Sequence, residues 1–130
     1  MSLENIISKI SKKKMESNFQ KQYSLKKRIS ESTRILIKYP NRIPIICERY
    51  GSSNIPNIDS NKYLVPLDLT VGKFLYVIRK RIKLSPESSI FIYVNNYLPA
   101  TSKLIKDLYT TECNEDGFLY ILYSSENTFG

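Results

Sequence analysis

The sequence contains no histidine, and this absence excludes many familiar catalytic and metal-binding arrangements. Without an imidazole there is no Ser-His or Cys-His nucleophile pair and no His-liganded metal. The four glycines are widely separated, so no glycine-rich phosphate loop can be assembled from them. We therefore expect a protein that is not an enzyme and that holds no metal or nucleotide cofactor.

Cysteines and long apolar runs are also scarce. The two cysteines, Cys47 and Cys113, are too few for a disulfide scaffold, so we expect both to be reduced. No apolar run approaches the length needed to span a bilayer, and Ile6-Ile7 is too short for a secretory signal. These features predict a protein that is made and kept in the cytoplasm.

Positive charge is concentrated at the start of the chain. The formal net charge is +8, and residues 1–40 hold 10 Lys/Arg against 3 Asp/Glu, whereas residues 41–130 hold 10 against 9. Such an arm favours acidic partners: phosphate backbones, anionic headgroups or acidic protein surfaces. Leu3, Ile6, Ile7 and Ile10 recur at helical spacing within it. Two interpretations stay open: a membrane-surface or partner-binding arm, and a solvated tail, which we favour.

The remaining chain predicts one α+β domain with helices on one face of a sheet. A helix begins at Ser24 and ends before Pro40, with Leu25, Ile29 and Leu36 facing inward and Arg28 and Glu31 facing out. Further elements are expected as strands at 42–48, 62–66, 90–94 and 118–123, a basic helix capped by Thr70, and a short helix at 102–108. The expected organisation is a flexible or weakly helical extension at 1–17, a domain at 18–123 and a mobile tail at 124–130.

Pro66 donates no backbone hydrogen bond, so it can end the strand at 62–66 or lie at the edge of the sheet. Side chains alternate along a strand, which places Tyr63 and Val65 on one side and Lys62 and Leu64 on the other. A peptide laid along this edge would therefore find apolar groups on both faces.

Several motifs, in this order, resemble the autophagy-related protein eight family of ubiquitin-like modifiers, which includes GABA-receptor-associated protein and microtubule-associated protein light chain 3. They are KYPNRIP at 38–44, KYLVP at 62–66, IRKR at 78–81, VNN at 94–96, DGFLY at 116–120 and the terminal Phe129-Gly130. The resemblance extends from about Leu25 to Gly130. It implies a ubiquitin-like β-grasp fold with two additional N-terminal helices.

The resemblance also implies that Gly130 is activated as a thioester and passed to the amine of phosphatidylethanolamine. The implied partners are activating and conjugating enzymes, a deconjugating cysteine protease, and a membrane reached through the lipid anchor. The protein would be cytoplasmic, and associated with an autophagosome or a related organelle when lipidated. Whether the chain is encoded to end at Gly130 or is trimmed to it stays open.

Two pockets for an aromatic-x-x-aliphatic peptide of cargo receptors and adaptors are implied as well. Pocket one comprises Glu31, Ile35, Pro44, Lys62, Leu64 and Phe118. Pocket two comprises Tyr63, Val65, Pro66, Leu69, Phe74, Val77, Ile78 and Arg81. Lys38 and Arg42, with Lys62 and Arg81, are the expected contacts for acidic residues that flank the peptide.

Two other functions remain as alternatives. A ubiquitin-like scaffold without conjugation would keep peptide binding and lose nothing when Gly130 is changed. A microtubule or nucleic-acid binder acting through the basic arm would show binding that collapses with salt. Nucleic acid is not the expected partner, because no interleaved aromatic and basic motif is present.

Overall fold

The computed structural model describes residues 17–51 and 54–125. Four predictions therefore lie wholly or largely outside the described residues: the extension at 1–17, its helical periodicity at 3–10, the tail at 124–130 and the conjugation at Gly130. The elements are α2 (Asn18–Gln22), α3 (Leu25–Lys38), β1 (Arg42–Arg49), β2 (Lys62–Pro66), α4 (Val71–Arg81), β3 (Phe91–Tyr93), α5 (Ile105–Glu112) and β4 (Leu119–Ser124).

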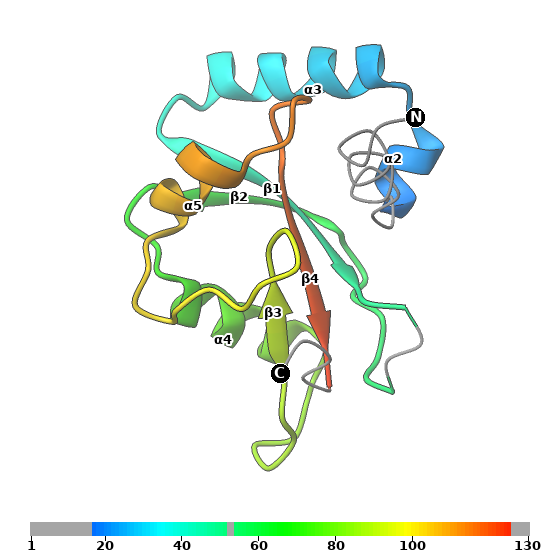
Figure 1. The fold of residues 1–130 in the computed structure, drawn as a ribbon, viewed down its shortest axis with the longest axis vertical. Coiled ribbons are helices and arrows are strands. Elements are labelled where there is room, and N and C mark those ends of the chain that lie inside the picture. Colours follow the sequence, from blue (N-terminus) through cyan, green and yellow to red (C-terminus); the bar gives the residue numbers. More distant parts are fainter. Residues whose placement is uncertain (1–16, 52–53, 126–130) are drawn as a thin grey trace, which may run out of the picture.

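The four strands form one sheet in the order β2-β1-β4-β3 (Figure 1). β1 and β4 run parallel in its centre, and β2 and β3 are antiparallel edges. Pro44 is tolerated in a central strand because β4 pairs with β1 only from Ile45 onward. The α+β class and the edge position of β2 are confirmed. Among residues 17–51, two helices precede the first strand; the resemblance implied two, but the sequence pattern predicted no helix at 18–22.

The two faces of the sheet bury separate apolar cores. The main core lies between the sheet and the helices α4 and α5, and it includes Phe74, Ile78 and Leu108. On the opposite face a second core joins Phe19 of α2, Ile46 of β1 and Phe118, with Ile35 of α3 and Tyr120 of β4 packed against it. Helices therefore cover both faces, whereas the sequence predicted one face only.

The predicted inward face of α3 is wrong at two of its three positions, whereas Leu36 is half-buried. Leu25 is 37% exposed and Ile29 is 41% exposed. The side that packs on the fold instead carries Ser32, which is 2% exposed, and Arg28, whose side chain is 12% exposed. Arg28 reaches a buried carboxylate on the loop before β4, so a tertiary ion pair overrides the apolar pattern of the helix.

The predicted start of the last helix is also wrong, since α5 begins at Ile105. The carbonyls of Lys103 and Thr101 accept hydrogen bonds from Val71 and Gly72, at 2.8 and 2.9 Å. These are donors of the first turn of α4, which the helix itself cannot satisfy. Residues 101–104 therefore form a turn and a bridge that cap a neighbouring helix instead of starting α5.

Candidate functional site

The outer edge of β2 is open to a further strand. The Cys47 N–H donates to the Asn61 carbonyl across the β1–β2 pair. Hydrogen-bonded pairs occur at every second position of an antiparallel ladder, so the next ones are Ile45 with Tyr63 and Ile43 with Val65. The backbone groups of Lys62 and Leu64 consequently point outward. Within residues 17–51 and 54–125 no strand lies against that side. A peptide could therefore add to the sheet here through main-chain hydrogen bonds.

One face of this edge leads to the second core. Lys62 forms an ion pair with Glu31 of α3, and its Nζ lies 5.2 Å from the centroid of the Phe19 ring. Beneath it, Phe19 and Phe118 meet edge to face with centroids 5.2 Å apart. The ion pair thus forms a polar lid over aromatic side chains. Its charges are partly exposed, so opening the lid costs little.

The other face leads to the main core. Tyr63 meets Phe74 edge to face at 5.7 Å, and the Arg81 guanidinium lies 5.8 Å from the centroid of the Tyr63 ring. Arg81 also pairs with Asp59 at 3.4 Å. Burial raises the pKa of the Tyr63 hydroxyl, and the Arg81 charge partly opposes the rise. That hydroxyl oxygen is buried and makes no hydrogen bond to a described residue.

The structure places the residues of the two predicted pockets around this one edge, but at different depths. Phe74, Ile78 and Phe118 are at most 1% exposed, and Pro44 and Val65 are also buried. The surface positions are Lys62, Leu64, Pro66, Val77 and Arg81, with Glu31, Ile35, Tyr63 and Leu69 half-buried between. An incoming anchor side chain would therefore meet a rim first and reach the deep residues only as the rim moves.

Two of the four predicted contacts for acidic flanking residues, Lys38 and Arg42, remain to be placed. Arg42 opens β1 opposite Pro66, and it is exposed. Lys38 ends α3, with its Nζ 5.4 Å from the centroid of the Tyr39 ring, and it is exposed too. Both cations are therefore available to an acidic ligand.

Sequence reasoning missed three residues of the second core: Phe19, Ile46 and Tyr120. Phe19 belongs to α2, which was not recognised as a helix. Its signal was the capping box, in which Ser17 and Gln20 bond each other's backbone N–H groups. Glu48 adds a second signal that no sequence pattern contains, because its carboxylate accepts from the N–H groups of Asn18 and Phe19 at 2.9 and 3.1 Å.

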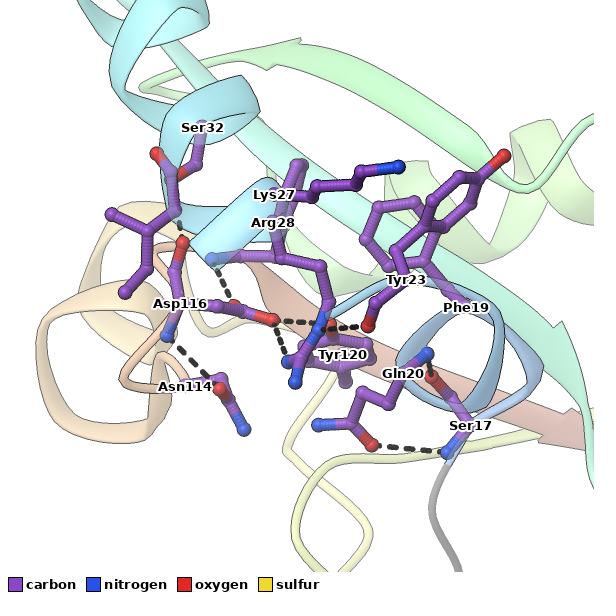
Figure 2. A network of polar contacts seen from close by, with 12 residues as sticks. Ser17, Phe19, Gln20, Tyr23, Lys27, Arg28, Ser32, Asn114, Asp116 and Tyr120 are labelled. Atoms are coloured by element: carbon purple, nitrogen blue, oxygen red, sulfur yellow. Dashed lines mark hydrogen bonds and ion pairs between the residues drawn. The ribbon is translucent and has the colours of Figure 1, made fainter. Parts of the chain in front are cut away.

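A buried polar network positions α3 over the second core (Figure 2). Asp116 accepts from Arg28 at 2.6 Å, from the Tyr120 hydroxyl, and from the Phe118 N–H at 2.9 Å. Ser32 donates to the Asp116 carbonyl at 2.5 Å. Burial, followed by the hydrogen bond to Asp116, raises the pKa of Tyr120. For Arg28, burial lowers the pKa, but the bonds to Asp116 and Tyr120 make the net direction upward.

Two hollows lie away from the β2 edge. Their volumes are about 240 and 230 Å³, and they share Asn18, Glu48 and Arg49 at the end of β1. None of the predicted pocket residues lines either of them. Among the described residues, no helix has the length and apolar character required to cross a membrane.

Comparisons with known proteins match this geometry. The family model described as autophagy protein Atg8, ubiquitin-like, matches residues 27–130. Autophagy-related protein 8 of Mycosarcoma maydis is 58% identical over 116 residues, covering 89% of this chain and 98% of the relative. The corresponding protein of Schizosaccharomyces pombe is 59% identical over 116 residues, covering 89% and 96%.

Solved structures agree. Trypanosoma brucei ATG8 superposes with a TM-score of 0.83 at 41% identity, covering 89% of this chain and 100% of that one. Plasmodium falciparum Atg8, solved in complex with a Plasmodium falciparum Atg3 peptide, superposes with a TM-score of 0.79 at 39% identity, covering 87% and 98%. The chain therefore belongs to the Atg8 family of ubiquitin-like autophagy proteins, and its fold is the ubiquitin-like fold of that family.

Proposed function

We propose that this chain is a modifier joined through the carboxyl group of Gly130 to the amine of phosphatidylethanolamine. Once on a membrane, it recruits proteins that carry aromatic-x-x-aliphatic peptides. Two acyl chains suffice for stable anchoring, at about 0.8 kcal/mol per buried CH₂. The chain is cytoplasmic before conjugation and membrane-bound after it, and it acts as the substrate of its conjugating enzymes rather than as an enzyme.

The open β2 edge, with an apolar core beneath each face, carries the peptide-binding half of the proposal. Lys62 and Leu64 supply outward backbone groups, and the two lids, Lys62 with Glu31 and Arg81 with Asp59, flank them. Both lids are ion pairs at the surface, which an acidic ligand can exchange at low cost. The Atg3 peptide bound to the Plasmodium falciparum relative supports peptides of the conjugating enzyme, as well as receptor peptides, as occupants.

Conjugation is tested by gel shift and intact mass of the protein recovered from its own cells. The native protein is expected to show a phosphatidylethanolamine adduct, and Gly130→Ala is expected to lose it. Gly51→Ala is the matched control: Gly51 is exposed and a Cβ there meets no atom within 4 Å, so the only cost is local strain from its φ of +45°. An adduct that persists in Gly130→Ala, or none in the native protein under starvation, would refute conjugation at this residue.

Peptide binding is tested with Leu64→Asp and Val77→Asp, which are 39% and 38% exposed and lie on the two faces of the edge. Each should weaken a micromolar peptide roughly 10- to 100-fold, the equivalent of one buried anchor. Tyr76→Asp, beside Val77 but 59% exposed, should leave affinity unchanged. A peptide N-methylated at its ladder positions should not bind. Equal affinity for the methylated peptide would exclude strand addition.

A further inference from the structure

The outer side of α3 carries two parallel rows of side chains, of which only Lys38 is assigned to the peptide site. Residues four apart lie above one another on a helix, so Leu25, Ile29, Thr33 and Ile37 form one row. The next row, one residue along, consists of Lys26, Ser30, Arg34 and Lys38. An apolar row and a basic row therefore run side by side along the length of the helix.

Every position in both rows is exposed. Ile37 is 76% exposed, more than any other large apolar side chain of the described residues, and Ile29 is 41% exposed. Figure 1 shows α3 at one extremity of the fold, with β1, β2 and α5 on its inner side. The inner side is held by Arg28 and Ser32, which bond to Asp116. The apolar row is thus not a displaced part of the core.

The charge around these rows has one sign. Glu31 is the only acidic residue of α3, and it is engaged with Lys62 on another side of the helix. The exposed cations Lys26, Lys27 and Arg34 have no carboxylate partner within salt-bridge distance among the described residues. An anionic partner would therefore meet no repulsion here.

The shape of the face selects among anionic partners. Both rows lie on the outer surface of one helix at an extremity of the fold (Figure 1), and every position in them is exposed, so this face is a helix surface rather than a groove between elements. An acidic peptide would need a groove to bury its own apolar side chains. A membrane interface is different, because a helix lies on it with apolar side chains inserted and Lys/Arg at headgroup level.

We propose that the outer face of α3 is a contact surface for membranes containing anionic lipids. The apolar row enters the interfacial region, and the basic row contacts lipid phosphates. The contact needs no covalent lipid, so it operates on the unconjugated chain and does not depend on Gly130. On a conjugated chain it would orient the domain with α3 against the bilayer.

The test is flotation of the full-length, unconjugated protein with vesicles of phosphatidylcholine mixed with phosphatidylserine, and with vesicles of phosphatidylcholine alone. Binding is expected only to the anionic vesicles and should weaken with salt. The basic-row variant Lys26→Gln/Arg34→Gln should lose roughly 25-fold in affinity, at about five-fold per cation. The apolar-row variant Ile29→Ser/Ile37→Ser should lose roughly ten-fold or more.

Matched controls change the same chemistry on other faces. Lys73→Gln/Lys106→Gln removes two exposed cations from α4 and α5, and Tyr76→Ser/Leu98→Ser removes two exposed apolar groups. Both controls should bind vesicles nearly as the native protein does. Circular dichroism should show unchanged helix content for all four variants.

Three results would overturn the proposal. In the first, the native protein does not bind anionic vesicles. In the second, the row variants and the controls lose vesicle affinity equally. In the third, the row variants bind vesicles as the native protein does. The last result would assign any vesicle binding to another part of the chain, such as the basic extension at 1–16. None of the three would bear on conjugation at Gly130 or on peptide binding at β2.

Discussion

Replacing Arg28 by methionine tests whether the buried ion pair holds α3 on the sheet. The carboxylate of Asp116 has no exposed surface, and within residues 17–51 and 54–125 Arg28 is its only cationic partner. Removing one partner of a buried pair leaves an uncompensated charge, which costs roughly 3–5 kcal/mol. The bond from Arg28 Nε to the Tyr23 carbonyl, at 3.1 Å, is lost as well. The free energy of unfolding of a domain is about 5–15 kcal/mol, so a loss of this size should make the variant markedly unstable.

The assay is urea denaturation of four proteins: native, Arg28→Met, Asp116→Asn and the double variant. The double variant should be more stable than the two single losses together predict, by roughly 2–3 kcal/mol, because the unpaired charge is then absent. Arg34→Met, an exposed arginine of the same helix, should change stability by less than about 0.5 kcal/mol. A loss below about 1 kcal/mol for Arg28→Met would refute the reasoning, since only a solvent-screened pair is worth so little.

Three further predictions concern stability. Burial raises the pKa of Tyr123 to about 12. The contribution of Tyr123 to the free energy of unfolding is therefore complete below about pH 10. It declines as the pH rises from there toward the pKa of the folded chain, because the unfolded chain loses its proton first. Tyr123→Phe should flatten this decline in denaturation measured at alkaline pH, and an unchanged slope would contradict it. Gly117→Ala should lower the free energy of unfolding by at least roughly 2 kcal/mol, because φ is +89° and the new Cβ lies 2.5 Å from the Ser32 Oγ. Adding Ser32→Gly should restore only part of that stability, because it removes the contact but not the positive φ. Glu48→Ala should lower the free energy of unfolding by roughly 1–2 kcal/mol and speed hydrogen exchange at the start of α2, and Glu48→Gln should lower it by less. Equal exchange in the native protein and both variants would exclude capping by Glu48.

Local chemistry explains why much of the fold could be predicted from the sequence. Thr70 caps α4 through the Lys73 N–H, at 3.2 Å, as a threonine before an apolar stripe should. Asn95 and Asn96 both adopt positive φ, which suits the tight turn predicted for them. Pro66 ends the edge strand, and the alternation of Tyr63 and Leu64 across β2 follows from a period of two. Each signal acts over a few residues, so no distant contact is needed to interpret it.

The candidate site could be predicted only in part. The sequence, with the family resemblance, determined the edge strand, the basic helix beside it and the candidate pocket residues around them. How deeply each pocket residue is buried was not predictable, because a residue on the apolar stripe of a helix can lie in the core or at the surface. Phe74 is fully buried, whereas Val77 on the same helix is 38% exposed. Ion pairs such as Glu31 with Lys62 join residues 31 apart, and no local pattern encodes them.

What the sequence determined by itself was therefore the elements from α3 onward, their order and the alternation of side chains along β2, because these follow from short-range periodicity, caps and turns. Only the tertiary structure decided which side of α3 is buried. The periodicity of Leu25 and Ile29 pointed inward, but Asp116, 88 residues from Arg28 along the chain, pairs with that arginine instead. A buried carboxylate must be neutralised, and this requirement outweighs the burial of two apolar side chains at a helix surface.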